Sequence, residues 1–599
     1  QQVPEFVTWL PNWYDAILSL LAEERRQSVA VFGPNASEVM VKVLGECFRP
    51  ILSSFASRLE QVYSSSNKGS LESICAVYEA TLQFLSLAYE VVAGGWLDAA
   101  EQGTSTDAKV LYEDMVAVFL QIASPFVTYQ ERLPALEQAY SRVAKTPVAK
   151  EFQQTANDAS LDTLQDAAER LQSLSSFIFP LAESAVARFE LLNGGYRATT
   201  ALATVDRLLA GHAGELAIAV RTLSAAMTAN ENFLADNFDE QHVLCALQVL
   251  KVAGTFRRDL RAFETKTRER CGLLAERMIA HAAQTEAFQT MSKLSLPDTL
   301  SAVEIDSILT AAVCSEPNDN EAVAVLRRLA AGNEHISPLY PDAEEATARL
   351  AQSCHSLVFD VCSSVPRKHL ADMPSMASWK EKAGGGTVDS YGTLPQAYIT
   401  GVGEHMLALV QALEPFVSDP ESLALANEVM NDVRSVALEP WREFVAAAGA
   451  PETEVVVQSL VDGKALRDFV IQGTMVDEEE QEDEDDANNE GTVFCNAWLD
   501  VVGLAVTGQL LERIMRINQL TPRGCEHLSA DLNYLINVLS ALGVSEHPHP
   551  LVNHFAELVM IDEAALKDQI MVRDRNLPLS AALRAAETRI SSMRGISTN

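Results

Sequence analysis

The side chains best suited to chemistry in this sequence are three groups of cysteine and histidine, the residue types that bind zinc most often. The groups are Cys354-His355 with Cys362 and His369, Cys525 with His527, and His547 with His549 and His554. None has the two-plus-two spacing of a structural zinc site. Helical spacing instead predicts core positions for Cys354 and Cys362, and His547-Pro548-His549-Pro550 is expected to form a stiff surface turn. We therefore predict no metal site.

Signatures of other catalytic sites are also absent from the sequence. It contains no GxxxxGK[ST] loop, no GxSxG elbow, no HExxH pair and no EF-hand ladder of acids. Gly384–Gly386 lacks a following Lys-Ser or Lys-Thr, which predicts a flexible turn. Gly401-x-Gly403 has no third glycine and no preceding strand, so we expect a close contact between helices. The sequence favours a protein that is not an enzyme and has no catalytic residue or cofactor; an enzyme with an unrecognised helical site remains an alternative.

The charge of the chain bears on its partners. Its 599 residues include 45 Lys and Arg against 82 Asp and Glu, a formal net charge of −37. Because such a surface repels phosphate, nucleic acid is not expected to bind. Direct adhesion to an anionic membrane leaflet is disfavoured for the same reason. Membrane association is therefore expected to be peripheral and to depend on partner proteins.

The surroundings of the protein are also suggested by its composition. No uncharged apolar stretch approaches the roughly 20 residues that span a bilayer, and nine cysteines without paired spacing are typical of reduced thiols in a cytosolic protein. The chain starts at Gln1 rather than Met, and we expect it to be part of a longer protein.

Apolar residues recur at helical spacing almost throughout the chain. The clearest pattern runs from Leu161 to Leu192, with Ser160 as a possible N-cap and Gly194–Gly195 as its end. Pro180 should kink this helix or divide it in two. Similar patterns cover residues 37–63, 71–97, 202–233, 242–288, 342–363, 395–417, 421–448, 493–520, 527–542 and 579–593.

These patterns predict an all-α fold, an elongated rod of consecutive helical bundles. We expect bundle domains at residues 1–155, 156–315 and 316–472, an acidic disordered linker at 473–492, and a C-terminal bundle at 493–599. The linker contains DEEEQEDEDD, Asp477–Asp486, in which nine of ten residues are acidic. Such a run repels itself and resists packing. A dedicated site for a basic partner is the alternative for this segment.

Two C-terminal helices have distinct apolar patterns. In Ser529–Gly543, Leu532, Leu535, Ile536, Leu539 and Leu542 form one stripe and Tyr534, Val538 and Ala541 a second beside it, which predicts an inner helix ended by Gly543. In Leu579–Met593, arginines flank the stripe. That helix is expected to be a core helix whose arginines complement the helix dipole; docking onto an acidic partner or lipid headgroups is the alternative.

Four stretches resemble the CATCHR group of helical vesicle tethers, which includes the exocyst and the conserved oligomeric Golgi (COG) complex. LSADLNYLINVLSALGV, Leu528–Val544, resembles a C-terminal signature of the group. TLPQAYITGVGEHMLALVQALEPFV, Thr393–Val417, and NAWLDVVGLAVTGQLLERIM, Asn496–Met515, precede it in the order found in the subunit-seven family of the COG complex. LPLSAALRAAETRISSMR, Leu577–Arg594, is similar to that family's final helix. The resemblance is specific over about the last 200 residues.

The resemblance implies a non-enzymatic subunit that tethers recycling vesicles at the Golgi. It implies other COG subunits as partners, especially subunits five, six and eight, together with SNARE and Rab proteins. The implied location is the cytosolic face of the Golgi membrane. A subunit of another tether such as the exocyst, or a helical transport scaffold, is the alternative. The residues that contact each partner are not indicated.

Overall fold

A computed structural model describes most of the chain. The described residues are 5–64, 70–93, 108–144, 152, 161–228, 233–236, 238–290, 299–314, 319–331, 338–381, 394–451, 453–462, 466, 490–544, 547–573 and 578–597. The acidic run at 477–486 and the glycines at 384–386 lie outside them, so the structure does not bear on those two predictions.

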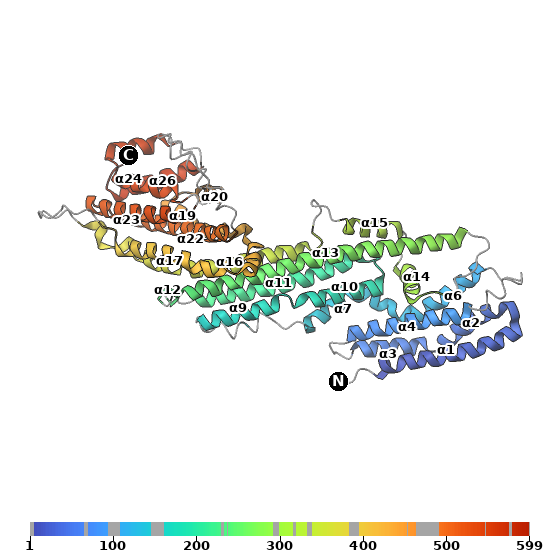
Figure 1. The fold of residues 1–599 in the computed structure, drawn as a ribbon. Coiled ribbons are helices and arrows are strands. Elements are labelled where there is room, and N and C mark those ends of the chain that lie inside the picture. The colour runs from blue at the N-terminus through green and yellow to red at the C-terminus, as the bar shows by residue number, and fades with distance from the viewer. Residues whose placement is uncertain are drawn as a thin grey trace. The chain divides into compact units, whose positions relative to one another are not determined.

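Every regular element among the described residues is helical (Figure 1), which confirms the prediction of an all-α fold. The α-helices are α1 (Glu5–Phe32), α2 (Ala36–Phe48), α3 (Leu52–Ser64), α4 (Ser70–Ala93), α6 (Ala108–Ala123), α7 (Val127–Ala144), α9 (Leu161–Ser175), α10 (Ile178–Asn193), α11 (Ala198–Thr228), α12 (Phe233–Asp236), α13 (Glu240–Thr290), α14 (Ala302–Cys314), α15 (Asp319–Ala330), α16 (Pro341–Ala371), α17 (Ala397–Val417), α18 (Pro420–Asn427), α19 (Leu438–Ala448), α20 (Glu454–Val461), α22 (Glu490–Met515), α23 (Pro522–Ala541), α24 (Pro550–Met560), α25 (Glu563–Val572) and α26 (Pro578–Met593). Short 3-10 helices are η1 (Gly33–Asn35), η2 (Ser124–Phe126), η3 (Met373–Ser375), η4 (Ala377–Lys380) and η5 (Met430–Ala437).

The chain forms two compact units built from interleaved segments. Unit 1 comprises residues 1–146, 177–212 and 259–345, and unit 2 comprises residues 147–176, 213–258 and 346–599. Helices α11, α13 and α16 each contribute residues to both units. The division into domains by chain order stays a prediction. Within unit 2, α22 begins at Glu490 and packs against α17 and α19, which lie on the other side of the predicted linker.

Unit 1 has an aromatic core between α1, α2, α3, α4 and α6 (Figure 1). Tyr78, Phe84 and Phe126 are fully buried in it. One buried ion pair accompanies this apolar core. Arg188 of α10 donates to both carboxylate oxygens of Glu137 of α7, over 2.6 and 2.9 Å. Two bonds in a fixed plane compensate the loss of hydration that burial imposes on both charges.

Unit 2 packs its helices closely at several glycines. A Cβ atom at Gly254 of α13 would lie 1.9 Å from the backbone oxygen of Leu425 of α18. A Cβ at Gly403 would lie 2.7 Å from the Tyr534 ring, and one at Gly401 would lie 2.6 Å from the His369 ring. Gly401-x-Gly403 is therefore the close helix contact that its sequence predicted.

The predicted inner helix is α23. Leu532, Leu535, Val538 and Leu539 are buried, whereas Ala541 at the C-terminal end is exposed, so the second apolar line is shorter than predicted. Gly543 follows at a φ of 66°, in the left-handed region, as expected of a glycine after a helix. The helix starts earlier than predicted because Thr521 accepts a hydrogen bond from the Gly524 amide and Pro522 follows it.

The long pattern around Pro180 is divided. Helix α9 ends at Ser175 and α10 starts at Ile178, so the break lies just before the proline. This is the second of the two outcomes expected for Pro180. The two helices belong to different units, α9 to unit 2 and α10 to unit 1. Gly194 ends α10 at a φ of 54°, as predicted.

Two segments are long and apolar enough to span a membrane by length and composition, Val110–Arg142 and Glu490–Met515. Each segment contains charged residues, so neither is an uncharged apolar stretch of the kind that the sequence was found to lack. Length and composition do not distinguish a span from a core helix. In the second segment, 72% of the apolar window is buried inside the protein, as in the core helix of a globular unit.

The helix contact at Gly254 can be tested by adding one methyl group. We expect Gly254→Ala to destabilise unit 2 by about 2 kcal/mol or more, because the Leu425 carbonyl is backbone and cannot rotate away. Gly214→Ala in α11 is the matched control. No atom lies within 4 Å of its added Cβ, and a helical alanine is favoured over glycine by roughly 0.5–1 kcal/mol. Urea unfolding of the two variants measures the difference, and equal stability would contradict the close contact.

Candidate partner-binding site

Helix α1 has one apolar face buried in unit 1. Its buried residues Phe6, Leu10, Tyr14 and Leu21 recur at helical spacing. The Tyr14 hydroxyl lies 2.9 Å from the Thr81 hydroxyl of α4, and its ring stacks on Phe84 with centroids 4.4 Å apart. Burial raises the pKa of the Tyr14 phenol well above its usual value, so this hydroxyl stays neutral. The contact fixes α1 against α4 along its length.

A second apolar stripe on α1 faces solvent. Trp9 is 49% exposed and Leu20 is 55% exposed, and Trp13 is half-buried between them. The three residues and Ala16 follow the spacing i, i+4, i+7 and i+11, which places them on one line along the helix. We call Trp9, Trp13, Ala16 and Leu20 the α1 stripe.

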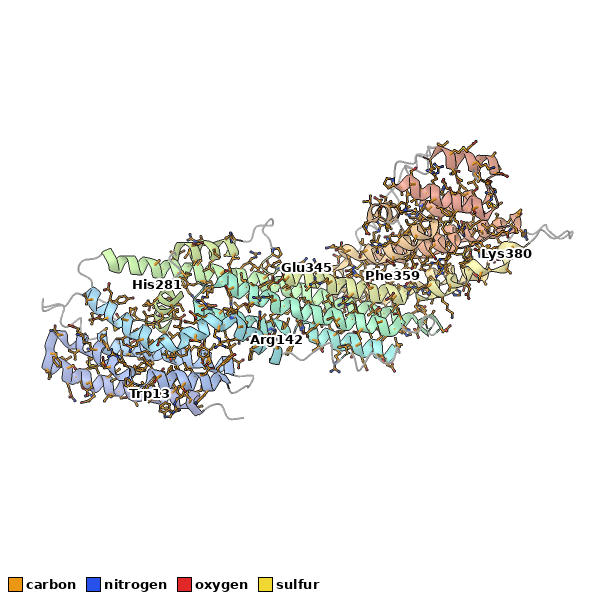
Figure 2. The ribbon with its side chains drawn as sticks, turned by 180° about the vertical axis from the view of Figure 1, so that it is seen from behind. Trp13, Arg142, His281, Glu345, Phe359 and Lys380 are labelled. Carbon is orange, nitrogen blue, oxygen red and sulfur yellow. The ribbon has the colours of Figure 1, made fainter. Side chains whose placement is uncertain are left out.

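Aromatic contacts hold the tryptophans of the α1 stripe in place. Trp9 and Trp13 stack with ring centroids 5.7 Å apart. Trp13 also meets the edge of Phe48 of α2 at 5.6 Å, and Phe6 joins Trp9 at 6.5 Å. Figure 2 labels Trp13 on α1. The two indoles are thus fixed before any partner binds, which reduces the entropy lost on binding.

The chemistry of the α1 stripe is that of a protein contact. Large aromatic and aliphatic side chains at the spacing of a coiled-coil seam can receive the apolar face of another helix. Tryptophan is also among the residues that contribute most to the binding free energy at protein interfaces. The sequence-based prediction left the partner-binding residues unknown. The spacing of Trp9, Trp13 and Leu20 was a readable signal, but only the structure separates this line from the buried face beside it.

The structure describes the three cysteine and histidine groups of the sequence. The described residues contain no cluster of three or more His, Cys, Asp or Glu side chains that could hold a metal ion. Cys354 and Cys362 are buried in the core, as predicted, and burial raises the pKa of both thiols to about 12. Cys47, in contrast, is exposed, and Cys245 and Cys495 are half-buried, so not every cysteine is a core thiol.

The prediction of a surface turn at His547-Pro548-His549-Pro550 is wrong. His549 is buried, with its Nε2 donating to the Leu460 carbonyl at 2.9 Å and its Nδ1 accepting from the Leu551 amide at 3.3 Å. His547 donates to Asp500 at 3.1 Å, and Asp500 also accepts from Arg434. The two histidines are therefore hydrogen-bonded core residues. The neighbouring prolines indicated a turn but not whether that turn is buried.

Arg589 of the last helix and Arg594, which follows it, are hydrogen-bonded inside unit 2. In α26, Leu579, Leu583, Ala586, Ile590 and Met593 are buried, which confirms the core stripe. Arg589 donates to the carbonyls of Met515 and Ile517 at the end of α22. Arg594 donates to the carbonyls of Leu558 and Ile561 at the end of α24. Cations at helix C-termini satisfy unpaired carbonyls and the helix dipole, so this arrangement favours the core interpretation over lipid docking.

Two of the family-like stretches are joined by one buried carboxylate. Asp531 of α23 accepts hydrogen bonds from the Gln396 backbone amide, the Gln396 side chain and the Tyr398 hydroxyl, at 2.8, 2.8 and 2.9 Å. Burial raises the pKa of Asp531, and these hydrogen bonds oppose the rise. The start of α17 is thereby fixed to α23. Helical periodicity in the sequence could not predict this contact, because the two segments are far apart in the chain.

Comparison with known proteins gives a consistent family. The model of the family described as Golgi complex component 7 (COG7) matches residues 1–438. Conserved oligomeric Golgi complex subunit 7 of Arabidopsis thaliana is 21% identical over 586 residues, which cover 91% of this chain and 62% of that protein. The protein of the same name from Bos taurus is 22% identical over 500 residues, covering 79% and 54% of the two chains. The one from Homo sapiens is 22% identical over 466 residues, covering 73% and 51%.

These matches differ in how much of each protein they cover. The chain spans about half to three fifths of the length of these relatives. The family match at residues 1–438 also includes the helices upstream of the last 200 residues, over which the resemblance in the sequence is specific. No solved structure matches the chain significantly.

The buried histidines of unit 2 predict acid sensitivity. Burial lowers the pKa of His355 to about 4 and that of His549 to about 3. Because the unfolded chain binds these protons near pH 6.5 and the folded chain does not, stability falls as the pH drops from about 6.5 toward 4, by up to ~1.4 kcal/mol per pH unit for each histidine. Urea unfolding followed by tryptophan fluorescence at several pH values measures this slope.

A pair of variants separates the histidine contribution from general acid effects. We expect His355→Phe, beside Trp498, to reduce the slope, because the residue can no longer bind a proton when unfolded. His527→Phe is the control, since His527 pairs with Glu381 at the edge of the unit rather than in the core. An unchanged slope in His355→Phe would contradict the account.

Proposed function

The chain belongs to the Golgi complex component 7 (COG7) family, and on that basis we propose that it is a non-enzymatic subunit of the conserved oligomeric Golgi complex. Family membership agrees with the resemblance found in the sequence. Because the chain spans only part of the length of its relatives, the activity of the whole protein is part of the proposal. The proposed activity is retrograde intra-Golgi vesicle tethering and maintenance of Golgi organisation, carried out through contacts between helices.

The proposed partners are other subunits of the same complex, especially subunits five, six and eight, together with SNARE and Rab proteins. The proposed location is the cytosolic face of the Golgi membrane, with peripheral attachment through these partners. A net charge of −37 supports indirect attachment, because an acidic surface is repelled by anionic headgroups. Arg589 and Arg594 support it further, because both donate to carbonyls at helix ends.

The observation that carries the proposed mode of action is the α1 stripe. Exposed tryptophan and leucine in a continuous line are costly to leave in water, and such surfaces mark protein contacts. A helix can bind another helix through an apolar line of this kind if it is held in place by its own protein. The contacts of Tyr14 with Phe84 and of Trp13 with Phe48 hold α1 in place. We propose that an apolar helix of another subunit packs along the α1 stripe.

Substitution of two exposed residues tests this proposal. We expect Trp9→Ser combined with Leu20→Ser to reduce co-purification of subunits five, six and eight by about tenfold or more, because hot-spot side chains contribute about 2 kcal/mol or more each. Immunoblots of the subunits recovered with the tagged full chain from cells measure the change. Because Trp9 also contacts Trp13 and Phe6, circular dichroism of the double variant checks that the fold is retained.

Leu273→Ser provides the matched control for that experiment. Leu273 lies on α13 in the same unit and is 56% exposed, but it is not part of the α1 stripe. It should leave co-purification unchanged. Recovery of all three subunits with the double variant at the level of the control would overturn the α1 stripe as the contact. Recovery of exocyst subunits instead of COG subunits by the original chain would overturn the proposed complex.

A further inference from the structure

Unit 1 contains a cavity of about 380 Å³ between helices α4, α10, α13 and α14. Its volume lies in the range of small-molecule sites, roughly 300–1,000 Å³. Apolar side chains line much of the wall, among them Leu82, Leu191, Leu274 and Met278. Polar groups also reach it from all four helices, so the cavity is not simply a gap in apolar packing.

Asp306 is the central polar group of this cavity. It lies in the middle of α14, and the Tyr78 hydroxyl of α4 donates to its Oδ1 at 2.9 Å. Asp306 lines the cavity and is partly exposed. Burial raises the pKa of Asp306 to about 7, and nearby Glu190 adds to the rise while the Tyr78 hydrogen bond opposes it. A cation bound here would restore the favourable interactions that the carboxylate loses on burial.

The other charged residues of the cavity leave it acidic. Glu190 of α10 pairs with Arg277 of α13 at 2.9 Å, so those two charges balance. Glu79 of α4 and Asp306 then face the cavity with His281 of α13, which Figure 2 labels. An anionic ligand would meet two carboxylates here and a single arginine that already has a partner. The electrostatics therefore favour a positive ligand group.

We propose that this cavity binds a small organic amine, with its ammonium group on the Asp306 carboxylate and its apolar part against Leu274 and Met278. Charge-assisted hydrogen bonds to a carboxylate are about twice as strong as neutral ones. The apolar wall adds binding free energy in proportion to the ligand surface that it covers. This site is independent of the α1 stripe and of the proposed tethering function.

A set of three probes with the same apolar part tests the charge of the ligand. 4-Phenylbutylamine, 4-phenylbutanol and 5-phenylpentanoate carry the same phenylbutyl group and differ only in a positive, neutral or negative end group. We expect isothermal titration calorimetry of the full chain near pH 7.5 to show saturable binding of the amine, about tenfold or more tighter than that of the alcohol. 5-Phenylpentanoate should bind more weakly than either. Equal affinity for amine and alcohol, or no saturable binding of the amine, would overturn the proposal.

Two variants place the amine on Asp306. Asp306→Asn removes the charge but keeps an oxygen that can accept from Tyr78, and it should weaken amine binding about tenfold or more without changing alcohol binding. Glu183→Gln is the matched control, because it removes an acid in the same unit that pairs with Lys266 outside the cavity. It should leave amine binding unchanged. Equal effects of the two variants would overturn the assignment.

The pH dependence gives a readout that a structural role for Asp306 would not produce. Since a proton competes with the amine for Asp306, amine affinity should fall as the pH drops below about 7, by up to about tenfold per pH unit. Glu79, Glu190, Arg277 and His281 also face the cavity. The Asp306→Asn variant separates the contribution of Asp306 from theirs, because it should lose only the part due to Asp306. A pH profile identical in the variant would overturn the proposal.

Discussion

Close contact between apolar faces of long helices is the constraint on which the structure depends. A helix satisfies its own backbone hydrogen bonds, so what remains is to bury its apolar line along its whole length. The packing is closest at Gly254, Gly403 and Gly524, where an added Cβ would overlap a backbone carbonyl or an aromatic ring of a neighbouring element. Charged groups in the core are paired or hydrogen-bonded, as in Arg188 with Glu137 and Asp531 with Tyr398.

The helices and their buried lines could be predicted from the sequence, because periodicity depends on neighbours in the chain. The core stripe of α26, the break before Pro180 and the contact at Gly401-x-Gly403 are examples. Interactions between distant segments could not be predicted in this way. The link from Asp531 to Tyr398 joins residues more than a hundred positions apart, and the burial of His549 depends on a carbonyl from another helix. The assignment of α9 and α10 to different units has the same origin.

The candidate site illustrates a related limit of the sequence. Trp9, Trp13 and Leu20 have the spacing of a core stripe, and Phe6, Leu10 and Tyr14 have it as well. Helical spacing shows that both lines are apolar but not which of them the protein buries. Packing against α4 and α2 decides, and it leaves the tryptophans at the edge of the buried face. An apolar line that is partly exposed and fixed by its neighbours is well suited to bind another helix.

If a helix of another subunit covers the α1 stripe, the side chains of the stripe must lose access to solvent when the complex assembles. Hydroxyl-radical footprinting, read out by mass spectrometry, compares oxidation of Trp9 and Leu20 in the isolated chain and in the assembled complex. The account predicts strong oxidation of both side chains in isolation and marked protection on assembly, with Leu273 oxidised equally in both samples. Equal oxidation of Trp9 and Leu20 in the two samples would contradict it.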